Sequence, residues 1–245
     1  PLARLNRTYN FNSPDQEKEA MRWQLRLLID LCSNLPVSVV AMDDIEADDA
    51  IAYMAHTVRD LDGKSIIMST DKDFLQLVGD SCSVYNPIKK KMYDANKVVE
   101  EYGIHPANFL IYRVLDGDKS DNVPGVKGIG LTTIRKQFPE LAGLTKVSFD
   151  DILEKCKDGK AAALKKIFDG KSIVERNKKL MCLHDLDLSG QTKMQILEQY
   201  NRSVPTLNKL GLTKLFFEYK LFGAFGSYDE WVLSTWAPLN RYSEK

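Results

Sequence analysis

Residues 65–73, SIIMSTDKD, combine an apolar run with two closely spaced acids. The run predicts a fully buried strand over residues 65–70. Asp71 and Asp73 follow the strand directly, at its carboxyl end. In α/β sheets with parallel strands, ligands bind at the edge formed by the carboxyl ends of the strands. The stretch therefore predicts a polar site at one edge of a sheet.

Helix and strand patterns alternate around this stretch. A Ser13 cap followed by Pro14 predicts a helix to about residue 31, a short buried strand is expected over residues 37–40, and another helix begins at residues 46–49. Further along, the sequence predicts a short helix over 74–78, a strand at 84–85, and helices over 95–102 and 106–115. This alternation favours an α/β fold with a mostly parallel central sheet and helices on both faces.

Acidic residues gather in three windows of the chain. They are Asp43, Asp44, Glu46, Asp48 and Asp49, then Asp71 and Asp73, and finally Asp116, Asp118 and Asp121. Carboxylates gathered from three segments repel one another unless cations neutralise them, and Mg²⁺ or Mn²⁺ prefers hard oxygen ligands. Two such ions about 4 Å apart can activate water and stabilise the leaving oxygen of a phosphodiester. The windows therefore predict a divalent-metal site.

A glycine-rich loop, GVKGIG at residues 125–130, follows the third window. Glycines let backbone N–H groups approach phosphate oxygens, and the helix expected from residue 131 adds positive potential at its start. A tight connection between two helices is the alternative. A dinucleotide-binding fingerprint is disfavoured because a helix, not a strand, precedes the glycines.

Composition sets the remaining bounds. The 245 residues carry 34 basic and 34 acidic side chains, but residues 155–179 hold nine basic residues against three acidic ones. No apolar run approaches the roughly 20 residues of a membrane span, and the four cysteines form no CxxC pair. These features predict a cytoplasmic protein with reduced thiols and no membrane partner. The three histidines and the aromatic-rich C-terminal tail are expected to be structural.

Three motifs together resemble the 5′-nuclease family. They are residues 46–49 (EADD), residues 69–73 (STDKD) with Gln76 and Leu77, and residues 117–130 (GDKSDNVPGVKGIG). The family includes flap endonucleases, the 5′-nuclease domain of bacterial DNA polymerase I, and phage 5′-exonuclease and ribonuclease H enzymes. The resemblance spans residues 37–138. A short stand-alone chain is most similar to the phage-type enzymes, which implies a host cytoplasm.

The resemblance implies roles for individual residues. It places Glu46, Asp48, Asp49 and Asp71 around a first Mg²⁺ or Mn²⁺ ion, and Asp73, Asp118 and Asp121 around a second, with Asp71, Asp73 and Asp118 central to catalysis. It also implies a helix–three-turn–helix element that binds DNA, whose hairpin comprises Gly125, Val126, Lys127, Gly128, Ile129 and Gly130. The carbonyls of this hairpin would bind K⁺, and Arg135 and Lys136 would contact phosphates. The family begins with a strand carrying a further aspartate and a basic arch. Since this chain starts at Pro1, Arg4 and Arg7 are interpreted as remnants of that arch.

The expected function is Mg²⁺-dependent hydrolysis of phosphodiesters at 5′ flaps, nicks or 5′ ends of DNA or RNA strands in duplexes, alongside replication proteins. The expected organisation is a nuclease core (1–105), a helix-hairpin-helix DNA-binding element (106–145) and a helical C-terminal region (146–245). One alternative is a branched-DNA-binding fragment with impaired catalysis. Another is a phosphatase with Asp71 as nucleophile, which leaves the glycine loop and the third acidic window without a role.

Overall fold

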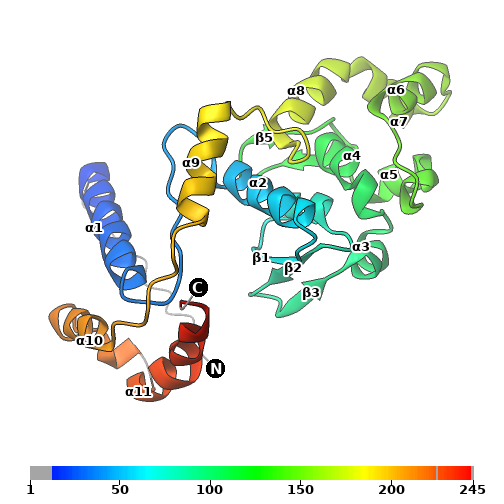
Figure 1. Cartoon of the computed structure of the whole chain (residues 1–245). Helices are drawn as coiled ribbons and strands as arrows, with labels where there is room; N and C mark the ends of the chain where they lie inside the picture. Colours follow the sequence, from blue (N-terminus) through cyan, green and yellow to red (C-terminus); the bar gives the residue numbers. More distant parts are fainter. Residues whose placement is uncertain (1–12, 225, 244–245) are drawn as a thin grey trace. The chain divides into compact units, whose positions relative to one another are not determined.

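The computed structural model describes residues 13–224 and 226–243. Its chain forms two compact units, which are described separately (Figure 1). The central unit comprises Met42–Lys193, and the terminal unit comprises Pro1–Ala41 together with Met194–Lys245. Both boundaries expected from the sequence, after residues 105 and 145, fall inside the central unit.

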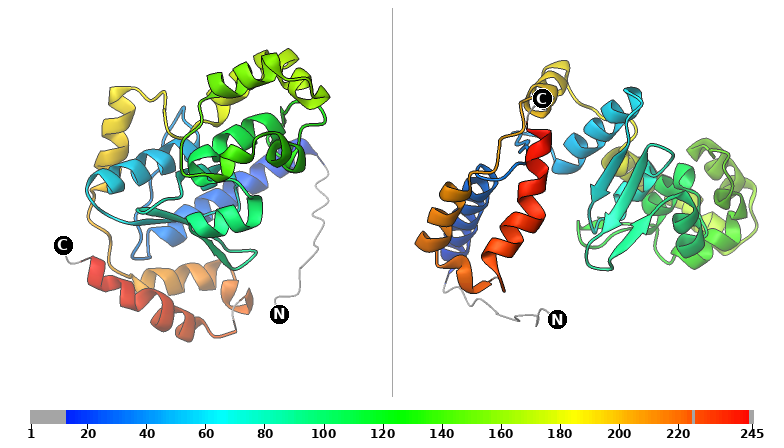
Figure 2. Two further views of the ribbon diagram at one scale, coloured as in Figure 1. Left: turned by 90° about the vertical axis from the view of Figure 1, so that its right-hand side faces the viewer. Right: turned by 60° about the horizontal axis from the view of Figure 1, so that its bottom comes forward.

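The central unit contains a small sheet and most of the helices (Figure 2). Its elements, in chain order, are α2 (Ala47–Asp60), β1 (Ser65–Met68), a 3₁₀ helix (Asp73–Leu77), β2 (Cys82–Asn86), β3 (Lys91–Tyr93), α3 (Ala95–Tyr102), α4 (Pro106–Asp116), β4 (Gly117–Asp118), β5 (Val123–Pro124), α5 (Leu131–Gln137), a 3₁₀ helix (Pro139–Ala142), α6 (Phe149–Asp158), α7 (Ala162–Asp169) and α8 (Lys171–Met181). Helix α9 (Gly190–Tyr200) follows and crosses the boundary between the two units.

The main sheet has the order β1-β2-β3. Strand β1 pairs in parallel with β2, and β2 pairs antiparallel with β3, so the described sheet is mixed and the mostly parallel sheet predicted from the sequence is not confirmed. Only residues 87–90 separate β2 from β3. So short a connection permits antiparallel neighbours, whereas parallel neighbours need a crossover of a dozen or more residues. The broader expectation of a mixed helix-and-sheet fold is confirmed.

Strand β1 lies where the apolar run predicted it, but it is not fully buried. Ile67 is 7% exposed, whereas Ile66 and Met68 on its opposite face are 66% and 69% exposed. In the described sheet β1 is an edge strand with one neighbour, β2. An apolar run alone does not distinguish a strand covered on one face from a strand covered on both.

The helices of the central unit begin where the sequence predicted them. Glu46 is the N-cap residue of α2. His105 caps α4, where its side chain accepts a hydrogen bond from the Ala107 N–H at 3.3 Å, and Pro106 occupies the first turn. Helix α4 is buried along most of its length and contacts both the 3₁₀ helix at Asp73–Leu77 and α8. It therefore forms the centre of the unit's core.

The terminal unit is helical. Its elements are α1 (Pro14–Cys32), α10 (Lys209–Glu218), a 3₁₀ helix (Leu221–Ala224), α11 (Tyr228–Trp231), a π-helical segment (Val232–Trp236) and a 3₁₀ helix (Ala237–Tyr242). Ser13 caps α1 as predicted, accepting from the Gln16 N–H at 3.3 Å. Phe216 is buried and stacks with Trp231 and Phe222, which confirms a core role for these aromatics, although Phe217 is 70% exposed.

The strand predicted over residues 37–40 is wrong. These residues are extended but belong to no strand, and no described strand pairs with them. Val37 packs on the core of the terminal unit, whereas Val39 is 47% exposed. A strand needs a hydrogen-bonded neighbour, which a short apolar run cannot supply by itself.

All four cysteines are free thiols. Within the described residues, no helix has both the length and the apolar character needed to cross a membrane.

Candidate metal centre

Six carboxylates from three chain segments line one pocket of about 640 Å³ in the central unit. We call this group the acidic pocket, and it comprises Glu46, Asp48, Asp71, Asp73, Asp118 and Asp121. One oxygen from each of Asp71, Asp73 and Asp118 lies within 4.8 Å of the others. The three acidic windows of the sequence therefore meet in space, as expected.

The segment after β1 presents Asp71 and Asp73. The Asp71 N–H donates to Ser69 Oγ at 3.0 Å, and the Asp73 N–H donates to Asp71 Oδ1 at 2.8 Å. These turn-forming bonds fix the backbone between the end of the strand and the 3₁₀ helix. The side chain of Asp73 is thereby buried, at 8% exposed for the residue as a whole.

Gln76 fixes this segment through three hydrogen bonds. Its side-chain amide donates to the carbonyls of Asp73 and Met181 at 2.9 Å each, and its Oε1 accepts from the Leu183 N–H at 3.0 Å. Gln76 is 2% exposed, so the three bonds satisfy a buried amide and tie the Asp73 turn to the end of α8.

The start of α2 supplies Glu46, its N-cap residue, and Asp48 in its first turn. Burial, reinforced by the charges of Asp71, Asp73, Glu46 and Asp121, raises the pKa of Asp48 from 3.8 to about 6. Mutual repulsion of this kind is relieved by a bound cation. The electrostatics of the pocket therefore favour a positively charged ligand.

The hairpin formed by β4 and β5 supplies Asp118. Asp118 Oδ1 accepts from the Ser120 N–H at 2.7 Å and from the Ser120 hydroxyl. Although burial acts in the opposite direction, these bonds and the contact with Arg113 lower the pKa of Asp118 to about 2. Asp118 is therefore ionised over the whole neutral range.

Arg113 is the residue at this site that sequence reasoning missed. It lies on α4 and is 2% exposed, and its guanidinium forms ion pairs with both Asp73 and Asp118. Burial raises the pKa of Asp73, and the nearby Arg113 only partly offsets this. A signal was present in the sequence, because one arginine interrupts the apolar run FLIYRVL at residues 109–115, and a buried charge requires a partner.

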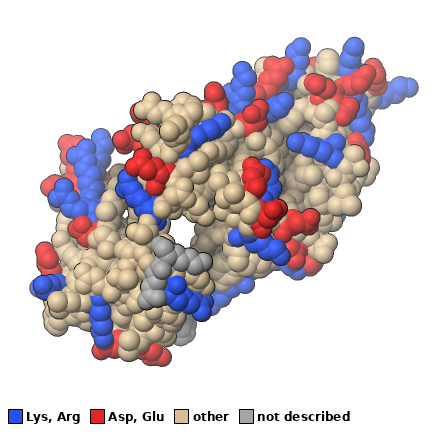
Figure 3. All heavy atoms as spheres, viewed as in Figure 1, with Lys and Arg blue, Asp and Glu red and all other residues tan. Residues whose placement is uncertain are grey.

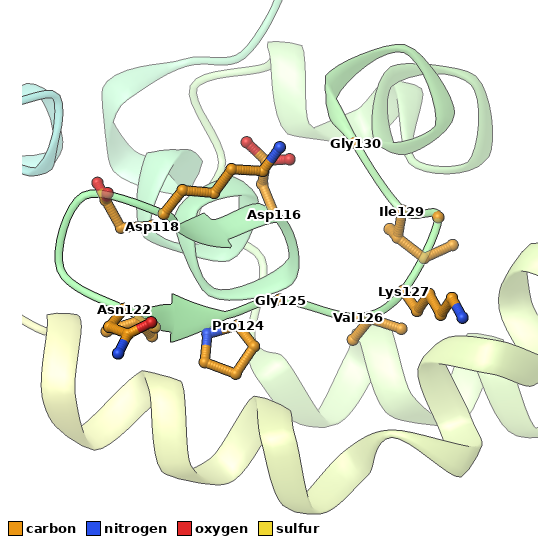
Figure 4. Close-up of a pocket in the computed structure, with 12 residues that line it drawn as sticks. Asp116, Asp118, Asn122, Pro124, Gly125, Val126, Lys127, Ile129 and Gly130 are labelled. Carbon is orange, nitrogen blue, oxygen red and sulfur yellow. The ribbon is translucent and has the colours of Figure 1, made fainter.

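The glycine loop lines a second pocket of about 780 Å³, together with Asp116, Asp118 and Lys119 (Figure 4). Val126 and Ile129 are buried and anchor the loop to the central core, whereas Lys127 points outward. Gly125 packs so closely on the backbone of Asp116 that a Cβ would overlap its carbonyl. Gly128 has φ +80°, and Lys166 Nζ on α7 lies 3.6 Å from the position that a Cβ would take there.

The other residues predicted for the site lie in different surroundings. Asp49 is not among the described residues that line the acidic pocket. Lys136 is exposed on α5, and the Arg135 guanidinium packs against Gly103 at the end of α3. Arg4 and Arg7 lie outside the described residues. Basic side chains project from the region of α6–α8, interspersed with acidic ones (Figure 3).

The donor set fits divalent metal ions with oxygen ligands. The six carboxylates of the acidic pocket face one buried guanidinium, which leaves a large negative excess. No histidine or cysteine is among the described residues that line the pocket. A pocket of carboxylates without nitrogen or sulfur donors suits Mg²⁺ or Mn²⁺ better than Zn²⁺ or copper.

Part of the chain is similar to known 5′-3′ exonucleases. The model for the 5′-3′ exonuclease N-terminal resolvase-like domain matches residues 4–103. The chain is 36% identical over 124 residues to a 5′-3′ exonuclease of Buchnera aphidicola, a match covering 49% of this chain and 43% of that protein. It is 31% identical over 131 residues to a 5′-3′ exonuclease of Aquifex aeolicus, covering 52% and 45%. The matches thus span less than half the length of these curated relatives.

Solved structures show the same fold. A bacteriophage T5 flap endonuclease, in a pseudo-enzyme–product complex with DNA and metal ions, matches with a TM-score of 0.59 at 18% identity, over 86% of this chain and 74% of that chain. The T5 protein co-crystallised with metal ions matches with a TM-score of 0.56 at 19% identity, over 86% and 75%. Residues 4–103 thus resemble the N-terminal domain of 5′-3′ exonucleases, and the fold resembles that of the T5 proteins.

Proposed function

We propose that this protein is a Mg²⁺-dependent, structure-specific 5′-nuclease that hydrolyses phosphodiester bonds at 5′ flaps, nicks or 5′ ends of strands in duplexes. The observation that carries the proposal is the acidic pocket, where carboxylates from three segments converge beside the glycine loop. Asp118 lines both pockets, so a phosphate backbone held at the loop would lie next to the metal ligands.

The acidic pocket would hold two ions. Glu46, Asp48, Asp49 and Asp71 would serve one ion, and Asp73, Asp118 and Asp121 the other. Bound Mg²⁺ or Mn²⁺ would supply a water activated at neutral pH and stabilise negative charge on the phosphate oxygens. The contribution of the chain is to orient its carboxylates. Ser69 and Gln76 hold the backbone of Asp71 and Asp73, and Ser120 bonds the carboxylate of Asp118.

The nucleic acid would be held by its backbone. Residues 125–130 would offer backbone N–H groups to phosphates and carbonyls to K⁺, with Lys136 and Lys166 adding positive charge beside the loop. Such contacts do not read base sequence, so the proposed substrates include both DNA duplexes and RNA–DNA hybrids. Replication proteins as partners, a cytoplasmic location and the three-part organisation at residues 105 and 145 belong to this proposal.

The test separates chemistry from binding. Asp73→Asn and Asp118→Asn should abolish Mg²⁺-dependent cleavage of a 5′-flap duplex and leave salt-sensitive duplex binding in place. Asp62→Asn, in the exposed turn after α2, is the matched control and should cleave normally. Cleavage by either site variant at the wild-type rate would refute the assignment. Duplex binding by the wild-type chain without cleavage would favour a branched-DNA-binding protein with impaired catalysis.

A further inference from the structure

Arg113 is a charged side chain in the apolar core of the central unit. Its neighbours on α4 include Phe109 and Val114, both fully buried, and Arg113 itself is 2% exposed. A buried guanidinium is costly unless its N–H groups are bonded and its charge is paired. The partners of Arg113 therefore indicate why it is there.

The guanidinium bridges two chain segments that both line the acidic pocket. Its Nε donates to Asp73 Oδ1, its Nη2 donates to Asp118 Oδ2, and its Nη1 donates to the Gly117 carbonyl at 3.4 Å. Asp73 begins the 3₁₀ helix after β1, and Asp118 ends the short strand β4. The planar fork of arginine can fix two carboxylates at once in a set orientation, which the point charge of lysine cannot.

We propose that Arg113 is the positioning residue of the metal centre, because it holds Asp73 and Asp118 side by side and so presents them, together with Asp71, to a divalent cation. The inference rests on the proposed function. Arg113 bonds Asp73 through Oδ1 and Asp118 through Oδ2, and each carboxylate oxygen has a second lone pair available for a metal. Without the bridge, the two neighbouring carboxylates would repel each other and separate.

A merely structural role predicts the opposite result in metal binding. If Arg113 served only to neutralise charge in the folded protein, its positive charge would oppose an incoming cation, and removing it would strengthen metal binding. If Arg113 positions the ligands, removing it weakens metal binding, because loss of a group that orients metal ligands typically costs about 10- to 100-fold in affinity. The two roles therefore differ in the sign of the effect.

The experiment titrates Mn²⁺ into the full chain without nucleic acid, using calorimetry and the EPR signal of free Mn²⁺. Arg113→Gln should bind Mn²⁺ about 10- to 100-fold more weakly than wild type. Arg113→Lys should fall between the two, because one ammonium reaches only one of the carboxylates well. In cleavage assays, the half-saturating Mn²⁺ concentration should rise for both variants while KM for the duplex stays the same.

Asn108 provides the matched control on the same helix. It is fully buried, and its side chain bonds the carbonyls of Leu141, Gly143 and Thr145 and the Val147 N–H, with no carboxylate among these partners. Asn108→Ala should lower the melting temperature and leave Mn²⁺ affinity unchanged.

Circular dichroism identifies the variants that fold. If Arg113→Gln does not fold, the Mn²⁺ affinity of Arg113→Lys tests the positioning role. Unchanged or tighter Mn²⁺ binding by a folded Arg113 variant would overturn the positioning role while leaving the proposed function intact. Failure of the wild-type chain to bind Mn²⁺ would instead overturn the metal centre itself, and the positioning role with it.

Discussion

Replacing Asp48 with Asn should stabilise the metal-free protein at neutral pH. Burial and four neighbouring carboxylates raise the pKa of Asp48 from 3.8 to about 6, so ionised Asp48 is less favourable in the folded state than in the unfolded one. The full rise corresponds to ~3 kcal/mol. Asp48 is only partly buried, and solvent screening reduces that figure to about 1–2 kcal/mol. The start of α2 favours a negative charge by about 0.5 kcal/mol, which is too little to reverse the sign.

The pH dependence has a defined direction. Below pH 3.8 the Asp48 carboxyl is protonated in both states and carries no penalty, and the penalty grows as pH rises and is complete above about pH 6. In EDTA, the difference in stability between Asp48→Asn and wild type should therefore be small at about pH 4 and largest above about pH 6. A gain of 1–2 kcal/mol corresponds to about 2–8 °C in melting temperature.

Thermal unfolding with and without Mn²⁺ completes the test. Saturation of the wild-type site at about 100 times Kd should add ~2.7 kcal/mol of stability, and Asp48→Asn should gain clearly less because it has lost a ligand. Asp62→Asn, in the exposed turn after α2, should behave as wild type throughout. A lower melting temperature for Asp48→Asn at neutral pH in EDTA, or an equal Mn²⁺ effect in both proteins, would refute the reasoning.

Three further predictions concern the surroundings of the pocket. Gly125→Ala should destabilise the protein by at least ~3 kcal/mol in urea unfolding, because its Cβ would overlap the Asp116 carbonyl. Gly79→Ala is the control. A Cβ at Gly79 would have no atom within 4 Å, so this variant should change stability by less than about 0.5 kcal/mol. Gln76→Ala should cost about 2–3 kcal/mol in the same assay, because it removes three bonds and leaves buried backbone groups unpaired; a loss below about 0.5 kcal/mol would contradict this. Lys166→Ala should weaken duplex binding and reduce its salt slope by about one, while Lys97→Ala on α3 should not; equal slopes would exclude Lys166 as a phosphate contact.

Much of the site was predictable because its chemistry is encoded locally. Acids placed directly after β1, at the start of α2 and in the β4–β5 hairpin converge because strand ends and helix starts share one edge of the fold. The cap at Ser13 was predictable for the same reason, because capping depends on residues close in sequence.

The features that could not be predicted from the sequence depend on contacts between residues distant in the chain. The apolar run at residues 65–68 did not reveal that one face of β1 is exposed, and residues 37–40 have strand-like composition but no described neighbouring strand. Strand β3 was missed because it has only three residues and is defined by its pairing with β2. Arg113 pairs with Asp73, 40 residues earlier in the chain, a separation across which helical periodicity carries no information.

The most direct test of the central claim is cleavage of a 5′-labelled flap duplex by this chain, first with Mg²⁺ and then with EDTA. The account predicts cutting near the junction in Mg²⁺ and none in EDTA, because the carboxylates of the acidic pocket act only through bound metal. A folded chain that binds the duplex yet leaves it intact in both Mg²⁺ and Mn²⁺, or one that still cuts in EDTA, would contradict the account.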